Sequence, residues 1–257
     1  MTLLNPGGAY ADDSKFRARQ RLWQYQTPYF DIVDWVTGLA GLQPGQRVLD
    51  AGCGNGAYLR ALRGRPVRAV GCDLSPGMLA AAGHPHLANA DITALPLRDG
   101  AADVVLAIHM LYHVPDRRAA IAELRRVLVP GGTCIAVTNS ASHMRSVHDL
   151  IEQAAGRLTP GWQMESPVRV FTAENGAAQL ETAFASVTRM TGGGAPVIIQ
   201  DAAVVADYVA SVSDHYQDQV TRPWADVVED VRGAVQEVIA RDGAFVTTGT
   251  LAAFVCR

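Results

Sequence analysis

A glycine-rich turn that opens with an acid is the part of this 257-residue chain best suited to hold a ligand. Residues 50–56 read DAGCGNG and join an apolar run to a helical pattern. Glycines let the backbone approach a ligand closely, and the start of the following helix offers unbonded N–H groups. Asp73 comes 17 residues after Gly56, at the end of the next apolar run, where an acid can accept hydrogen bonds from both hydroxyls of a ribose. The turn and this acid together predict a site for a ribose-containing cofactor.

The spacing inside the turn argues against a nicotinamide dinucleotide. The usual dinucleotide turn has a GxGxxG spacing and no acid at its start. Here Asp50 precedes the first glycine, and Gly56 follows Gly54 by two residues instead of three.

Two histidines follow the apolar run 104–108 and could perform acid–base chemistry. In an open parallel sheet, ligands bind at the carboxyl ends of the strands, so His109 and His113 are expected beside the cofactor. Because histidine can take a proton near neutral pH, we predict both as candidate catalytic bases; the alternative is that they only pack locally. No acidic residue occurs from 104 to 114, so we expect no metal ion.

Strand and helix patterns alternate through the part of the chain that contains these residues. The expected strands cover 47–51, 67–73, 86–91, 102–108 and 133–138, and the expected helices cover 57–63, 76–82 and 117–129. Proline and two glycines at 130–132 are expected to stop the last of these helices. This alternation predicts a parallel sheet with helices on both faces.

The flanking regions are mainly helical. Helices are expected over 15–40, with a break at Pro28, and over 141–158, 174–184, 202–212 and 224–240, while two further strands are expected at 186–190 and 244–256. We therefore predict an α/β protein with a Rossmann-like, doubly wound, seven-stranded and mostly parallel sheet. Residues 1–41 would form an N-terminal helical lid, residues 42–140 the cofactor-binding core, and residues 141–257 the rest of the sheet with an inserted helical cap, all in one structural domain.

The composition favours a globular protein that acts on a small molecule. Hydrophobic residues make up 49% and charged residues 18%, which excludes a disordered chain. A net charge of −3 argues against a nucleic-acid binder. The four cysteines form no CxxC pair, the N-terminus does not have the order of a signal peptide, and the apolar runs are too short for a membrane span. We expect buried free thiols and a cytoplasmic protein that does not contact a membrane.

Four segments resemble the motifs of a known family, the class I S-adenosylmethionine-dependent methyltransferases. They read VLDAGCGNG at 48–56, AVGCDLSPGML at 69–79, NADITALPLRDGAADVVLAIHMLYHV at 89–114, and RRVLVPGGT at 125–133. The resemblance covers residues 42–139, and it implies S-adenosylmethionine as the cofactor.

The resemblance also implies which residues contact that cofactor. The turn would lie under the methionine portion through Asp50, Gly52, Cys53, Gly54 and Gly56. Asp73 would hold the ribose, and the adenine would lie among Leu74, Met78, Asp91 and Ile92. His109 would lie near the cofactor. In the lid, Arg17, Arg19 and Arg21 are candidates for the methionine carboxylate, because arginine matches a carboxylate with two hydrogen bonds, and Tyr25 is a further candidate. From this segment we select Arg21 and Tyr25.

The expected function is methyl transfer to an oxygen or nitrogen of a small molecule, by a monomer or homodimer. The composition, with Lys15 the only lysine, is typical of a high-GC bacterium and suggests bacterial secondary metabolism. Two alternatives remain open. An RNA- or protein-directed methyltransferase would need a basic, open crevice, and a repurposed cofactor-binding protein would bind the cofactor without methyl transfer.

Overall fold

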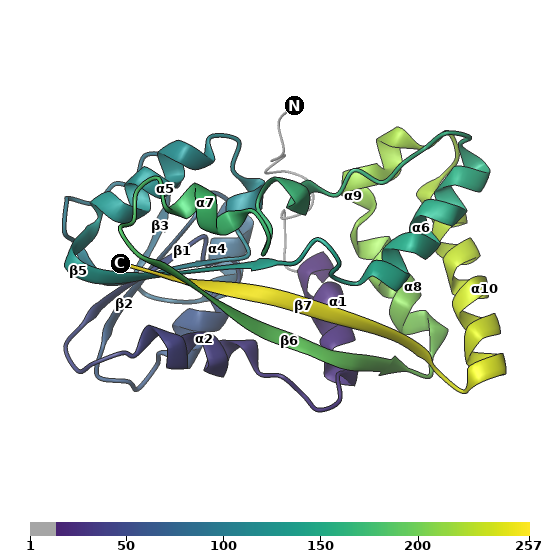
Figure 1. Ribbon diagram of the computed structural model, residues 1–257, viewed down its shortest axis with the longest axis horizontal. Coiled ribbons are helices and arrows are strands. Elements are labelled where there is room, and N and C mark those ends of the chain that lie inside the picture. Colours follow the sequence, from purple (N-terminus) through teal and green to yellow (C-terminus); the bar gives the residue numbers. More distant parts are fainter. Residues whose placement is uncertain (1–13) are drawn as a thin grey trace.

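A twisted sheet of seven strands runs through the molecule in the order β3-β2-β1-β4-β5-β7-β6 (Figure 1). The computed structural model describes residues 14–257. The strands are β1 (Arg47–Ala51), β2 (Arg68–Asp73), β3 (Leu87–Asn89), β4 (Ala102–Ile108), β5 (Leu128–Asn139), β6 (Val187–Ile199) and β7 (Phe245–Cys256). All neighbouring pairs are parallel except those of β7, which runs antiparallel to both β5 and β6. This confirms the predicted α/β class with a mostly parallel, seven-stranded sheet.

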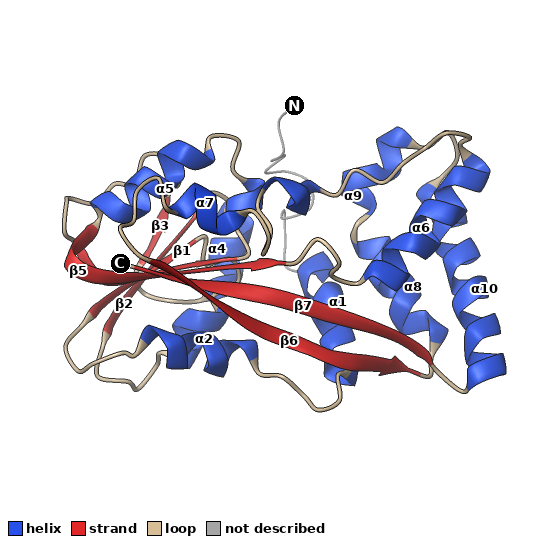
Figure 2. Ribbon diagram, viewed as in Figure 1, coloured by secondary structure: helices blue, strands red, loops and turns tan. Residues whose placement is uncertain are grey.

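Helices cover both faces of the sheet, because alternate residues of the central strands point to opposite sides (Figure 2). Val104 and Leu106 of β4 pack toward α2 (Ile32–Ala40) and α3 (Ala57–Ala61). Val105 and Ala107 pack on the other face, which α5 (Arg117–Arg126) and α7 (Gly176–Leu180) cover. α4 (Pro76–Ala82) follows β2, and the short 3-10 helices η2 (Leu111–His113) and η3 (Pro167–Val170) complete the surroundings of the sheet.

A second group of helices lies at the far end of β6 and β7, at the right of Figure 1. It consists of α6 (Arg145–Leu158), α8 (Ala202–Ser211), α9 (Ser213–Tyr216) with the 3-10 turn η4 (Gln217–Gln219), and α10 (Trp224–Asp242). These helices share their own apolar core, which also receives Leu22 from the N-terminal helices α1 (Ser14–Arg21) and η1 (Leu22–Tyr25). None of the helices in the described range 14–257 is both long and apolar enough to cross a membrane.

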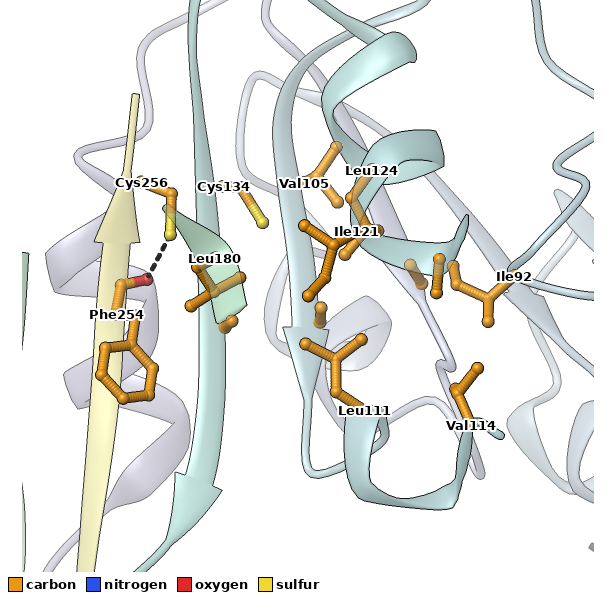
Figure 3. Close-up of a cluster of buried hydrophobic side chains, with 14 of the residues drawn as sticks. Ile92, Val105, Leu111, Val114, Ile121, Leu124, Cys134, Leu180, Phe254 and Cys256 are labelled. Carbon is orange, nitrogen blue, oxygen red and sulfur yellow. Dashed lines mark hydrogen bonds between the residues drawn. The ribbon is translucent and has the colours of Figure 1, made fainter. Parts of the chain in front are cut away.

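The core beneath α5 and α7 is closely packed (Figure 3). Phe254 of β7 is fully buried and meets Phe171 edge-on, with ring centroids 6.2 Å apart. The Cys256 thiol donates to the backbone oxygen of Phe254 at 3.6 Å. All four cysteines are buried and free, as the absence of paired spacings predicts.

Several boundaries match the predictions, others differ, and three of the differences have identifiable reasons. The helix expected over 117–129 ends at Arg126, because β5 already begins at Leu128. Pro130 and the two glycines after it lie inside β5, next to an irregularity in its pairing with β4. β6 extends to Ile199 because Gly193 and Gly194, both with positive φ, form a bulge opposite β7 and do not end the strand. α6 begins at Arg145, after a loop, and not at residue 141.

Candidate active site

A cavity of about 960 Å³ lies at the carboxyl ends of β1 and β4. These two strands lie on either side of the point where the strand order of the sheet reverses. This volume lies near the upper end of the range for small-molecule sites. Its wall contains most of the residues predicted for the cofactor, namely Asp50, Gly52, Cys53, Gly54, Asp73, Leu74, Met78, Asp91, Ile92 and His109, and it also contains His113.

The glycine turn is fixed against the end of β2. Gly52 and Gly54 have φ values of 76° and 52°, which an L side chain rarely adopts. The Gly54 N–H donates to Asp73 Oδ2 at 2.9 Å, and the Ser75 N–H donates to Asp73 Oδ1 at 2.8 Å. Asn89 holds the same loop by donating from its side chain to the backbone oxygens of Asp73 and Leu74. Two backbone donors thus orient the Asp73 carboxylate, and Asn89 is a positioning residue that the sequence did not single out.

Gly56 is not on the cavity wall. A Cβ atom at this position would lie 2.9 Å from the Cβ of Ala82 in α4. The glycine therefore allows α3 and α4 to approach each other.

Asp91 lies at the start of the connection from β3 to β4, on the cavity wall. Its Oδ1 accepts hydrogen bonds from the backbone N–H and the hydroxyl of Thr93, both at 2.8 Å. One carboxylate oxygen thus stabilises the local turn.

Asp50 is a buried acid with an unused oxygen. It is 1% exposed, and its Oδ2 has no hydrogen-bond partner among residues 14–257. Burial raises the pKa of the Asp50 carboxyl to about 7, and the charge of Asp73 acts in the same direction. An unpaired buried acid beside a second acid is suited to a cationic group of a ligand.

This pKa leads to a testable pH dependence. Between pH 3.8 and about 7, the folded chain binds a proton at Asp50 that the unfolded chain has released, so this contribution to the free energy of unfolding decreases as the pH rises. Asp50→Asn removes that contribution. From pH 5 to pH 7.5, we expect the free energy of unfolding of Asp50→Asn to rise relative to the wild type by about 2 kcal/mol. Urea unfolding of both proteins at the two pH values measures this, and parallel pH profiles would contradict it.

His109 has a strained backbone at the end of β4. Its φ of 53° is one of two positive values at non-glycine residues in the described chain, the other being that of Met144. Its Nδ1 atom is buried and has no hydrogen-bond partner within residues 14–257. Burial lowers the pKa of His109 to about 4. Such outliers often occur at functional sites.

Several histidines contribute to the cavity wall. Five of the seven in the chain line it, namely His109, His113, His143, His148 and His215. Burial lowers the pKa of His113 to about 3, with further lowering by His215, Arg19 and His109, and burial lowers the pKa of His148 to about 4. These side chains are therefore neutral at pH 7. The sequence did not single out His143 or His148, although His143 follows the carboxyl end of β5, the neighbour of β4, and the same rule could have found it.

The N-terminal helices reach the cavity with other residues than the two selected. Arg21 lies 3.4 Å from Asp207 of α8 on the surface, Tyr25 is 37% exposed, and neither lines the cavity. Arg19 and Trp23 do line it, and Arg19 donates to the backbone oxygen of Ser211. Arg19 and Arg21 differ in this way because two residues correspond to about 200° around a helix.

Comparison with known proteins finds a related domain and relatives that share part of the chain. Residues 49–136 match the family model described as a methyltransferase domain. The chain is 35% identical over 130 residues to malonyl-(acyl-carrier protein) O-methyltransferase of Serratia marcescens, covering 49% of this chain and 51% of that protein. It is 34% identical over 140 residues to ubiquinone biosynthesis O-methyltransferase of Pseudomonas aeruginosa strain UCBPP-PA14, covering 48% and 60%. The chain thus matches little more than half the length of each relative.

The fold is also shared with a solved structure from Anabaena variabilis, described as a methyltransferase from an antibiotic biosynthesis pathway. The two agree with a TM-score of 0.62 at 16% identity, over 86% of this chain and 95% of the other, which shows a common fold. The segment matched by the family model begins in β1 and ends in β5, so it contains the glycine turn, both acids and His109. On this basis, residues 49–136 are similar to a methyltransferase domain.

Proposed function

We propose that this protein binds S-adenosylmethionine and transfers its methyl group to an oxygen of a small molecule. When bound, the cofactor supplies a methyl group activated by a positively charged sulfur. The protein must then align the acceptor, exclude water and accept a proton. The names of the two relatives favour oxygen over nitrogen, and their bacterial sources suit the proposed biosynthetic role in a bacterium.

The observation on which the proposal depends is the pair of acids at the glycine turn, the buried Asp50 and the half-buried Asp73. Asp73, held by two backbone N–H groups, would accept the ribose hydroxyls. The unpaired Oδ2 of Asp50 would face the ammonium group of the methionine portion. Met78 and Ile92 are buried apolar side chains on the wall and would flank the adenine. This chain therefore offers acceptors for the ribose hydroxyls and the ammonium group and apolar side chains for the adenine.

The rest of the cavity suits a small acceptor. It extends from His109 toward α6 and α8 and is lined there by apolar side chains, including Met144, Ile151, Met164 and Val212, together with the neutral histidines. Lys15 Nζ of α1 lies 2.5 Å from Asp214 Oδ1 of α9, and Arg19 of α1 donates to the backbone oxygen of Ser211 in α8. These two contacts attach α1 to the second group of helices. In this proposal residues 1–41 act as the lid and 141–257 as the cap, and residues 1–13 of the lid lie outside the described range. An RNA or protein acceptor is less well supported, because a polymer needs an open and basic crevice.

Two measurements test the proposal. Titration calorimetry should show binding of S-adenosylmethionine, and a panel of hydroxylated small molecules should include one that releases S-adenosylhomocysteine. If the cofactor does not bind, the whole proposal fails. Binding without release from any acceptor would favour the repurposed cofactor-binding protein.

A further inference from the structure

His143 is held in one orientation at the acceptor end of the cavity. It lies in the loop between β5 and α6, and its Nδ1 is 3.2 Å from the backbone oxygen of Thr250 in β7. A carbonyl oxygen can only accept a hydrogen bond, so Nδ1 must carry the proton. Burial lowers the pKa of His143 to about 3, which keeps the ring neutral. The tautomer is therefore fixed, with a lone pair on Nε2.

The surroundings of His143 hold its ring and its loop in place. Trp23 of η1 lies against it, with ring centroids 5.1 Å apart at 45°. A Cβ atom at Gly249 would lie 2.2 Å from the Trp23 ring and 3.0 Å from Cε1 of His143, so this glycine provides the space that both rings occupy. Met144, with a φ of 54°, donates from its N–H to the backbone oxygen of Thr248 at 2.8 Å and binds the loop to β7. A ring fixed by surrounding contacts is what a catalytic base requires.

His143 also lies close to the expected reaction centre. It lines the same cavity as His109, which follows β4, and β4 and β5 are neighbours in the sheet. The His109 backbone N–H donates to the oxygen of Val137 near the end of β5, at 2.9 Å. Each ring is near enough to the other that a charge on His109 would lower the pKa of His143.

We propose that His143 is the general base of the methyl transfer and that its Nε2 accepts the proton of the acceptor hydroxyl. This rests on the proposed function. As the acceptor oxygen bonds to the methyl carbon, the carbon–sulfur bond breaks and its electron pair stays on sulfur. The O–H bond breaks at the same time, its pair stays on oxygen, and the proton moves to Nε2. One positive charge enters the step on sulfur and leaves it on the imidazole, so the total charge in the cavity is unchanged.

His109 is less suited to this role, although the sequence selects it first. Its Nδ1 has no hydrogen-bond partner in the described chain, so nothing fixes which of its nitrogens is protonated. His143 differs, since its Nδ1 is engaged by the backbone oxygen of Thr250 while the ring lines the cavity.

Two variants separate the base from its support. His143→Asn keeps an N–H donor at the position of Nδ1, so the contact to Thr250 can persist, and it removes Nε2. His143→Gln keeps a polar atom near Nε2 and removes the Nδ1 donor. Neither variant has a basic nitrogen. We expect kcat, measured as S-adenosylhomocysteine release from the acceptor that the panel yields, to fall by about 100-fold to 10,000-fold in both. His86→Asn, on the surface away from the cavity, is the matched control and should keep the wild-type kcat.

Binding and spectroscopy distinguish the outcomes. Calorimetry should give His143→Asn the wild-type affinity for S-adenosylmethionine within about twofold. Long-range ¹H–¹⁵N spectra of the wild-type protein should show His143 as the Nδ1–H tautomer, which is measurable without any acceptor or active variant. The proposal is overturned by an Nε2–H tautomer, or by a His143→Asn enzyme with kcat within about threefold of the wild type. A wild-type protein without turnover would instead overturn the proposed function, and the base role with it.

Discussion

Asp73→Ala is expected to weaken the binding of S-adenosylmethionine by at least about 100-fold. Hydrogen bonds to a charged group contribute about 1.5–3 kcal/mol each, and Asp73 would make two of them to the ribose, so their loss amounts to at least about 3 kcal/mol. The substitution also frees the N–H groups of Gly54 and Ser75, which the carboxylate holds at 2.9 and 2.8 Å. The glycine turn would then lose its link to β2.

Titration calorimetry on the folded variant measures this effect. Asp73→Asn keeps the shape and one acceptor oxygen but loses the charge, and it should fall between the alanine variant and the wild type. Asp91→Ala is the comparison after the neighbouring strand β3. Because Asp91 Oδ1 already accepts two hydrogen bonds from Thr93, only Oδ2 remains for the cofactor, whereas each oxygen of Asp73 accepts one; we therefore expect a smaller loss of affinity, about tenfold. Affinity of Asp73→Ala within threefold of the wild type would remove the ribose role.

Phe254→Ala should be the most destabilising of the substitutions considered, lowering the free energy of unfolding by about 4 kcal/mol. The Phe254 side chain is fully buried in the cluster that includes Leu180 of α7 (Figure 3). It lies edge-on to Phe171. A Cβ atom at Gly176 would lie only 2.7 Å from the Phe254 ring, which shows how little space remains there. Truncation would leave a cavity that this tightly packed region cannot fill.

Urea unfolding measures the loss, and Val246→Ala provides the control on the same strand. Val246 is 49% exposed, so its truncation should change the free energy of unfolding by less than about 0.5 kcal/mol. Equal effects of the two substitutions would mean that the packing around Phe254 does not stabilise the fold as described.

The sequence predicts the central elements well because their signals are local. β4 has the predicted bounds, since it is a continuous apolar run covered on both faces. α4 also has them, because the Ser75 hydroxyl accepts a hydrogen bond from the Met78 N–H and proline occupies the first turn. Strand bounds further out are harder to predict: the glycines of β6 resemble a turn and become a bulge only when β7 pairs with them.

The residues of the candidate site likewise fall into some that have a local sequence signal and others that depend on tertiary contacts. The turn and Asp73 follow from their spacing along the chain. The contact that fixes His143 joins it to Thr250, 107 residues further on, and has no local signal. Whether Arg19 or Arg21 reaches the cavity depends on how α1 is turned against α8, which is a property of tertiary packing.

The position of β7 in the sheet has a consequence for the order of assembly. It is the last strand in sequence but lies between β5 and β6, so β6 has no neighbouring strand until β7 has entered. The five strands from β3 to β5 can associate earlier, and the long edge of β5 is then open to wrong partners. Pairing β5 with β7 closes a loop of roughly a hundred residues, which makes this a slow step of folding. Because Thr250 belongs to β7, the proposed base acquires its fixed tautomer only in that step, and a partly folded chain that already has the cofactor turn would still lack it.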